Sequence, residues 1–188
     1  MRLFNRAAMF NRRASEPKFK ANDVVRALEL KSGDVVADIG SGGGYFAMLL
    51  AKAVGESGKV LAVDYNLEFL SYVEKTAKER GIANIKAVHV GATTIELPEC
   101  CDLVFMRNVY HHIAQPLEYM SVMKKYLKPG GRIAILDYKR TAKWSHTTLF
   151  GHYVDEGQLA AVMERAGYRL ASGHDWLSEQ SFNVFEIA

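Results

Sequence analysis

The feature that most constrains the fold is a short apolar segment, residues 35–39, that runs directly into a glycine cluster. The cluster contains Gly40, Gly42 and Gly44, and a helix-like stretch follows it. Strands that are apolar almost throughout and are separated by helices indicate a parallel sheet covered on both faces. The expected strands cover residues 35–39, 59–63, 85–90, 102–106 and 132–137, and the expected helices 44–54, 66–80 and 116–127.

The end of the chain departs from this alternation. Asp155 and Gln158 resemble a capping box at the start of a further helix, which ends before Gly167. Two strand-like segments follow, 168–172 and 182–187, and they can pair as an antiparallel hairpin at the sheet edge. Because crossovers between parallel strands are right-handed, the pattern predicts a doubly wound α/β fold with about seven strands in one domain.

The charge of the chain is uneven. Residues 1–20 contain six basic residues and one acid, whereas the remainder has 18 basic and 20 acidic residues. We therefore expect a basic N-terminal arm or lid over 1–21 and a single domain over 22–188. Three roles remain open for the arm: a packing arm or lid over a pocket, a solvated tail, and contact of the basic residues with anionic lipid or RNA. In the last case apolar contact would be added by Leu3, Phe4, Met9 and Phe10. The slightly acidic body gives no clear indication of nucleic-acid binding.

Several classes of protein are excluded at this stage. The longest uninterrupted apolar run, residues 45–51, has seven residues, so no membrane span is expected. The first residues lack the apolar stretch of a secretion signal. The two cysteines, Cys100 and Cys101, are neighbours and form no disulfide framework. A cytoplasmic location is expected, and the sequence does not indicate an oligomeric state.

The glycine cluster lies where ligands bind in doubly wound sheets, outside the carboxyl end of a strand. Its glycines allow close approach of a ligand, and the amides at the following helix start favour a negative group. Asp64, at the end of the second expected strand, is placed to accept hydrogen bonds from ribose hydroxyls. Asp38 would repel a pyrophosphate and attract an ammonium or sulfonium centre. A nicotinamide dinucleotide remains an alternative, because Gly42, Gly44 and Ala47 match one form of the dinucleotide motif.

Four features in this order resemble class I S-adenosylmethionine-dependent methyltransferases. They are Asp38-x-Gly40-x-Gly42-x-Gly44, Asp64, Asp102-Leu103-Val104-Phe105 and Leu127-Lys128-Pro129-Gly130-Gly131-Arg132. The resemblance covers about residues 24–137. It implies a seven-stranded, Rossmann-like sheet in the order 3-2-1-4-5-7-6 with the last strand antiparallel, and S-adenosylmethionine as cofactor.

The resemblance also implies roles for individual residues. Asp38 and the glycine loop would hold the methionine part of the cofactor, and Asp64 its ribose. The backbone of Arg107 would contact the methionine amine. An acid that such enzymes commonly carry after the third strand is missing here. The expected cofactor-binding residues are Asp38, Gly40, Ser41, Gly42, Gly44, Asp64, Tyr65, Asn66, Ala92, Thr93 and Arg107.

Candidate catalytic residues follow the fourth expected strand, where Tyr110, His111 and His112 are consecutive. A neutral imidazole near the cofactor can act as a general base. The alternative is that one histidine only packs under the helix start. No metal site is expected, because the residues that could act as ligands show no diagnostic spacing. These candidate ligands are His111, His112, Asp137, His146 and His152.

Methyl transfer from S-adenosylmethionine to a small-molecule acceptor is the function that these features favour, since little of the chain remains to grip a macromolecule. Two alternatives stay open: a nicotinamide-linked oxidoreductase, and a non-catalytic protein of the same fold that binds the cofactor. A third chemistry, metalloid methylation through paired thiolates of Cys100 and Cys101, competes with their simple packing before a buried strand.

Overall fold

The computed structural model describes residues 2–91, 94–139 and 153–188. It contains one seven-stranded sheet in the order β3-β2-β1-β4-β5-β7-β6, which confirms the expected order. All neighbouring pairs from β3 to β5 are parallel, and β7 is antiparallel to both β5 and β6. The strands are β1 Val35–Ile39, β2 Lys59–Asp64, β3 Ile85–His89, β4 Cys101–Arg107, β5 Leu127–Tyr138, β6 Tyr168–His174 and β7 Gln180–Ile187.

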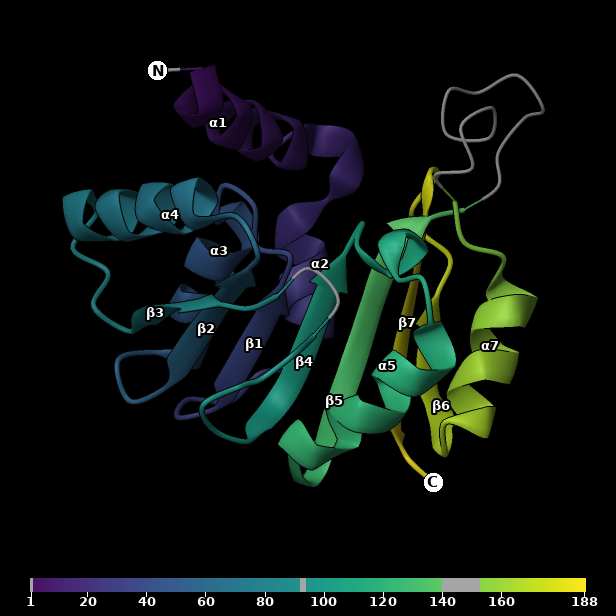
Figure 1. The fold of residues 1–188 in the computed structure, drawn as a ribbon. Helices are drawn as coiled ribbons and strands as arrows, with labels where there is room; N and C mark the ends of the chain where they lie inside the picture. Colours follow the sequence, from purple (N-terminus) through teal and green to yellow (C-terminus); the bar gives the residue numbers. More distant parts are fainter. Residues whose placement is uncertain (1, 92–93, 140–152) are drawn as a thin grey trace.

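Helices cover both faces of the sheet (Figure 1). One apolar core joins the sheet to α2, α3 and α4, and a second joins the opposite face to α5 and α7. Each central strand divides its residues between the two cores: Val36 faces the first and Ala37 the second, both fully buried. The α-helices are α1 Arg2–Ala14, α2 Ala21–Ala27, α3 Tyr45–Val54, α4 Leu67–Glu79, α5 Pro116–Met123 and α7 Glu156–Arg165.

The start of the chain is helical and lies over the rest of the domain (Figure 1). Helix α1 packs against α3 and α4, and its Ala7 and Ala14 are buried there. A 3₁₀ turn, Pro17–Phe19, then leads to α2 and buries the ring of Phe19. The basic segment is therefore folded onto the domain.

The segment between α5 and the main part of β5 differs from the sequence expectation. Helix α5 ends at Met123, and a 3₁₀ turn, Lys124–Tyr126, follows it. Strand β5 already begins at Leu127 and includes Pro129 and the two glycines after it. Proline lacks a backbone donor, so the pairing with β4 shifts register here, as it does at bulges.

The C-terminal hairpin is confirmed. Strand β6 is longer than predicted and ends at His174, inside the segment 173–175 that the sequence predicts as the turn. Asp155 caps α7 as expected, and its side chain accepts a hydrogen bond from the backbone of Gln158. Since β7 is antiparallel, its first residue, Gln180, lies at the edge of the sheet where the parallel strands end, paired with Tyr138.

Candidate active site

Four charged side chains lie at the edge of the sheet where the parallel strands end. Asp38 belongs to β1, Asp64 ends β2, Arg107 ends β4, and Asp137 lies near the end of β5. The two cores place these side chains on different faces. Asp38 and Arg107 continue the side of β1 and β4 that packs on α3, while the neighbours of Asp137 in β5, such as Ile135, pack toward α5.

The glycine loop needs its glycines for conformation and for space. Gly40, Gly42 and Gly44 have φ of 67°, 53° and 79°, which is the left-handed region. A Cβ on Gly40 would lie 2.4 Å from a methyl of Val109, in the loop after β4. The loop is therefore pressed closely against the ends of the neighbouring strands.

The amides of this loop already have partners. The backbone nitrogens of Gly40 and Ser41 donate to the carbonyl of Val63, at 2.8 and 3.0 Å. Gly42 donates to the carboxylate of Asp64 at 2.9 Å. At the start of α3, Tyr45 donates to the side-chain oxygen of Asn11 at 3.1 Å. The sequence predicts that amides here attract a negative group, but the protein itself satisfies these four.

Asn11 is a site residue that sequence reasoning missed. Its side-chain oxygen caps α3, and its side-chain nitrogen donates to the carbonyl of Gly43 at 2.8 Å. A Cβ on Gly43 would lie only 2.3 Å from both Asn11 and the carbonyl of Ala7. This glycine therefore allows α1 to dock on the loop. No local pattern connects residues 32 positions apart.

Asp38 is almost completely buried, at 3% exposure, and burial together with nearby Asp64 raises its pKa to about 7. Its Oδ2 has no hydrogen-bond partner among the described residues. The same holds for the buried hydroxyl of Ser41. Buried polar atoms of this kind usually have a partner, so each such atom calls for an explanation.

Arg107 supplies the opposite charge beside Asp38. Its guanidinium lies over the rings of Phe19 and Phe46, with centroids at 5.1 and 5.2 Å. Its Nε and one terminal nitrogen, Nη2, are buried without a hydrogen-bond partner in the described part of the chain. Burial lowers the pKa of this guanidinium, although Asp38 opposes the change. The sequence does not predict Phe19 and Phe46 at the site, because each reaches it from a different helix.

These orphan atoms test whether the implied cofactor fits. The amino-acid end of S-adenosylmethionine carries an ammonium and a carboxylate. Asp38 offers an unpartnered acceptor, and Arg107 offers unpartnered donors next to it. A carboxylate and a guanidinium suit the two ends of such a zwitterion. The residues present therefore fit the group.

Asp64 connects the loop to the next helix. One of its oxygens accepts from Gly42 and the other from the backbone of Asn66, both at 2.9 Å. Burial raises the pKa of this carboxyl, whereas the backbone hydrogen bonds lower it. Each carboxylate oxygen retains a further acceptor site, so Asp64 can still accept from hydroxyls.

The adenine side is described only in part. Asn66 caps α4 with its side-chain oxygen, which accepts from the backbone of Glu68 at 3.0 Å. Tyr65 is 63% exposed, and its carbonyl lies 3.1 Å from a ring nitrogen of His89. Ala92 and Thr93 lie outside the described residues. Tyr65 and Asn66 thus flank Asp64 at the open side of the loop.

The candidate catalytic residues form a short 3₁₀ turn after β4, Tyr110–His112. The Nδ1 of His111 lies 2.7 Å from a carboxylate oxygen of Asp137, and both side chains are nearly inaccessible. The backbone nitrogens of His111 and Tyr138 also donate to this carboxylate. An ionised carboxylate only accepts, so Nδ1 carries the proton and Nε2 is the basic nitrogen.

The residues on either side of His111, Tyr110 and His112, have different surroundings from it. Burial and Asp137 raise the pKa of Tyr110 to about 12, so its phenol stays protonated. His112 is exposed, and its ring centroid lies 4.0 Å from that of His111. The structure therefore brings both histidines together and places the carboxylate of Asp137 against His111.

Three further sequence expectations concern a metal site, metalloid binding by the two cysteines, and a membrane span. Within the described residues no group of three potential ligands could hold a metal ion, and His146 and His152 lie outside those residues. Cys101 is fully buried, and burial raises the pKa of its thiol to about 12. A protonated thiol is a poor metal ligand, which favours packing over metalloid binding. None of the described helices is long and apolar enough to cross a membrane.

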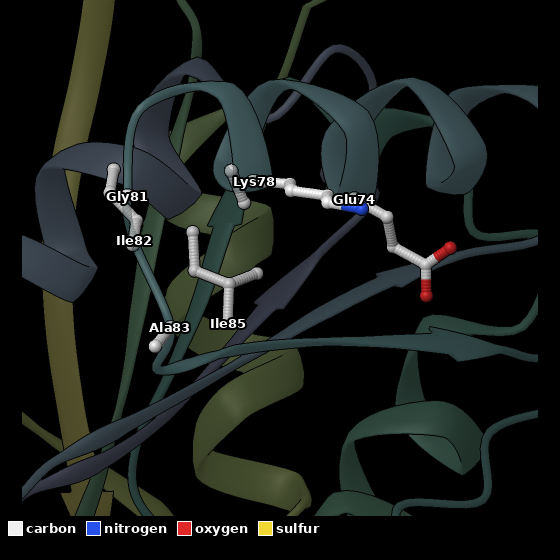
Figure 2. Close-up of a pocket in the computed structure, with 7 residues that line it drawn as sticks. Glu74, Lys78, Gly81, Ile82, Ala83 and Ile85 are labelled. Atoms are coloured by element: carbon white, nitrogen blue, oxygen red, sulfur yellow. The ribbon is translucent and has the colours of Figure 1, made fainter.

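A separate hollow lies at the other end of the sheet, between the last turns of α4 and the start of β3 (Figure 2). Ile82 and Ile85 line it together with Glu74 and Lys78. Parallel strands begin at this edge, whereas Asp38 and Asp64 lie where they end. The hollow therefore does not belong to the candidate site.

Comparison with known proteins places these features in a wider group. A family described as "Methyltransferase domain" matches residues 30–180. The demethylmenaquinone methyltransferase of a Geobacillus species is 25% identical over 163 residues, which are 85% of this chain and 68% of that protein. The chloroplastic 2-phytyl-1,4-beta-naphthoquinone methyltransferase of Arabidopsis thaliana is 30% identical over 151 residues, 78% of this chain and 57% of that protein.

A solved structure has a similar fold. The S-adenosylmethionine-dependent methyltransferase of Aquifex aeolicus superposes with a TM-score of 0.84 and 25% identity, covering 96% of this chain and 98% of that one. The match therefore includes the N-terminal and C-terminal parts of the sheet as well as the glycine loop.

Proposed function

Because this chain belongs to the methyltransferase family whose domain matches residues 30–180, we propose that it methylates a quinone-type small molecule in its reduced, hydroxylated form. S-adenosylmethionine is the methyl donor, and methyl transfer replaces the nicotinamide-linked alternative. The observation that supports the acceptor class is that both relatives named above act on naphthoquinone-type compounds, as their names state.

The cofactor roles follow from the orphan atoms. When bound, S-adenosylmethionine supplies an electrophilic methyl group on a sulfonium. Asp38 accepts from the ammonium of the cofactor, and the guanidinium of Arg107 donates to its carboxylate. This assigns the side chain of Arg107 a role, in addition to the backbone contact expected from the sequence. Asp64 accepts from the ribose hydroxyls, between Tyr65 and Asn66.

The adenine end of the cofactor lies toward Tyr65 in this proposal. Ala92 and Thr93 keep their proposed role on that side, and the loop of Gly40, Ser41, Gly42 and Gly44 lets the cofactor approach the backbone closely.

His111 is the proposed proton acceptor. Asp137 holds its Nδ1–H at 2.7 Å and so fixes the orientation of the ring, and Nε2 is the nitrogen that we assign to the proton transfer. Nε2 would take the proton of the acceptor hydroxyl, which raises the electron density of the acceptor ring. The ring carbon would then bond to the methyl group as the methyl–sulfur bond breaks, and the hydrogen of that carbon would leave as a proton while the oxygen is reprotonated. The buried carboxylate of Asp137 then stabilises the imidazolium. Tyr110 and His112 line the same turn and position the acceptor.

The proposed location is the cytosol, which suits an exposed free thiol such as Cys100. No membrane-spanning helix occurs in the described residues, and the acceptor is a small molecule rather than a nucleic acid.

The direct test uses the purified chain with methyl-labelled S-adenosylmethionine and chemically reduced demethylmenaquinone. We expect label in the quinol product, and none with the His111→Gln variant at equal cofactor occupancy. Binding of S-adenosylhomocysteine is measured in parallel by calorimetry. Full cofactor binding without label in this quinol, or in any compound of a metabolite extract, would overturn the proposal and favour a non-catalytic cofactor-binding protein.

A further inference from the structure

We propose that helix α1 and the adjoining start of α4 form a surface that docks on an anionic lipid bilayer. This surface, called here the docking face, consists of Arg6, Met9, Phe10 and Arg12 on α1 with Tyr65 and Leu67 beside α4. The proposal rests in part on the proposed function, because an acceptor with a long hydrocarbon tail resides in a bilayer.

The arrangement of α1 is unusual for a helix that packs on a domain. Its inward face carries the small residues Ala7 and Ala14 and the polar Asn11. Its two large apolar residues with described side chains, Met9 and Phe10, remain 47% and 37% exposed. The usual amphipathic arrangement would place such residues against the core. Here Met9 faces solvent, and Phe10 is partly exposed although its ring also contacts Phe69 of α4.

The exposed apolar residues are concentrated at one place. Tyr65 and Leu67 are 63% and 60% exposed, and both immediately precede or begin α4. The ring of Phe10 packs edge-on against Phe69 of α4 with centroids 5.6 Å apart, which brings the two segments together. Exposed apolar residues that gather rather than scatter mark an interaction surface.

Two arginines flank this apolar surface. Arg6 and Arg12 are exposed on α1 and form no ion pair among the described residues. The other basic residues of the segment lie elsewhere: Arg13 is over the ring of Tyr138, Lys18 pairs with Glu179 at 3.0 Å, and Lys20 is over the ring of Trp176. Arginines flanking exposed apolar side chains match the negative headgroups and the acyl boundary of an anionic membrane.

The position of the docking face relates it to the active site. Asn11 of α1 caps α3 and holds the glycine loop, and Phe10 lies within 4 Å of the Cβ position of Gly42. Docking on this face would bring the open side of the cofactor loop close to the lipid. An acceptor that is anchored in the bilayer by its tail could then reach the site without leaving the membrane entirely.

A single-stranded RNA is the other polyanion to consider. RNA contacts rely on basic side chains with aromatic rings on which bases stack. The docking face has two aromatic residues, but the ring of Phe10 is packed against Phe69. Its other exposed apolar residues, Leu67 and Met9, offer no ring for stacking and favour insertion into the acyl region. The observations therefore favour a bilayer.

The experiment is co-sedimentation of the full chain with vesicles of phosphatidylcholine, with and without phosphatidylglycerol. We expect binding only when phosphatidylglycerol is present, and release by high salt. The double variant Met9→Ser/Leu67→Ser should bind these vesicles at least about tenfold more weakly, because two apolar side chains no longer insert. The matched control Leu170→Ser/Ile187→Ser changes two similarly exposed apolar residues on the far side of the sheet and should bind normally.

Charge-reversal variants test the electrostatic contribution of the arginines to vesicle binding. Arg6→Glu/Arg12→Glu should weaken vesicle binding about a hundredfold or more, since each basic residue near an anionic surface contributes about fivefold and each reversal also adds a repelled negative charge. The control Lys52→Glu/Lys86→Glu, at exposed positions near the other end of the sheet, should not. Thermal stabilisation by S-adenosylhomocysteine must remain in every variant, which shows that each one is folded.

Two outcomes would overturn the proposal: no vesicle binding by the parent chain, or equal loss in the control variants. Tighter binding to poly-uridine than to the anionic vesicles would assign the face to RNA instead. The test is independent of the acceptor, because vesicles contain no quinone. Vesicle binding without quinol methylation would therefore refute the proposed function and leave the docking face intact.

Discussion

The imidazole of His111 lies 2.7 Å from the carboxylate of Asp137, and a β-strand that is not adjacent in sequence supplies this partner. Asp137 is fully buried and also accepts from two backbone nitrogens, so its position is fixed. A buried carboxylate held in this way determines both the tautomer and the orientation of the ring.

We expect His111→Gln to lower kcat by about 10²–10⁴-fold, the usual contribution of a positioned base. Glutamine keeps a side-chain donor toward Asp137 but cannot accept a proton. The KM for S-adenosylmethionine should change little. A kcat within about threefold of the parent value, measured under saturating acceptor, would remove His111 from the proton transfer.

His112→Ala is the companion measurement. The imidazole of His112 is exposed, and its ring is tilted by 48° against that of His111 with the centroids 4.0 Å apart. We expect slower methyl transfer with unchanged binding of S-adenosylhomocysteine, and a smaller effect than that of His111→Gln. Single-turnover rates with calorimetric affinities separate the two. If the transfer rate stays at the parent value, His112 has no part in the reaction.

Cofactor binding should depend on pH through Asp38. The pKa of this carboxyl is raised to about 7 in the free protein, and only its charged form attracts an ammonium. The affinity for S-adenosylhomocysteine should therefore increase as pH rises toward 7 and level off above it. Calorimetry between about pH 5.5 and 8.5 measures this dependence. In Asp38→Asn the affinity should be lower by about tenfold or more, and its slope across this interval should be lost.

The same substitution should stabilise the free protein. Asp38 has an ordinary pKa when unfolded and a raised one when folded, so the folded chain loses stability as pH rises from about 4 to 7. The amide that replaces the carboxyl carries no charge and avoids this cost. We expect Asp38→Asn to gain about 1–3 kcal/mol at about pH 8 and nothing at about pH 4. Urea unfolding at the two pH values tests the difference, and an equal effect at both would contradict it.

Asp64 should affect both binding and local structure. Its carboxylate accepts from Gly42 and Asn66, so Asp64→Ala removes the connection between the loop and α4 as well as the proposed ribose acceptor. We expect cofactor affinity to fall about 100-fold and stability to fall by about 1–3 kcal/mol. The matched control is Asp155→Ala, which removes a cap far from the site. It should lower stability without changing the affinity.

The attachment of α1 depends on Asn11. Asn11→Ala removes two hydrogen bonds to the glycine loop and should cost about 1–2 kcal/mol. We expect α1 to become sensitive to trypsin, which cleaves after its arginines, while the rest of the domain resists. Gly43→Ala should give the same cleavage pattern, because a Cβ there collides with Asn11 and Ala7. Normal resistance in both variants would show that other contacts hold α1.

The sequence predicted the features that depend on local pattern. The alternation of strands and helices, the glycine loop after the first strand and the place of Asp38 at the end of that strand all follow from short segments whose periodicity or spacing is readable. The order of the strands in the sheet was implied by the resemblance to class I methyltransferases, and the structure confirms it. The boundary near Pro129 was wrong, because a proline and two glycines after a helix indicate its end just as well as a bulge inside a strand. The choice depends on pairing with β4, which is a tertiary contact.

The site residues that sequence reasoning missed share one property: their partners are distant in the chain. The guanidinium of Arg107 lies against Phe19 and Phe46 from two separate helices. Asn11 caps a helix that begins 34 residues later. His111 and His112 are identical in type and adjacent, so only the fold could show that Asp137 lies against His111.

The reversed direction of β7 affects how the domain can diversify. A further parallel strand would have needed a long crossover, whereas this antiparallel strand starts at the edge that carries the candidate site. The connection from His174 to Gln180 therefore lies close to the turn of His111 and His112, since Gln180 donates to Asn108 at 2.7 Å. If the proposed site is correct, insertions or exchanges in that connection will alter which acceptors are admitted, while the glycine loop remains untouched.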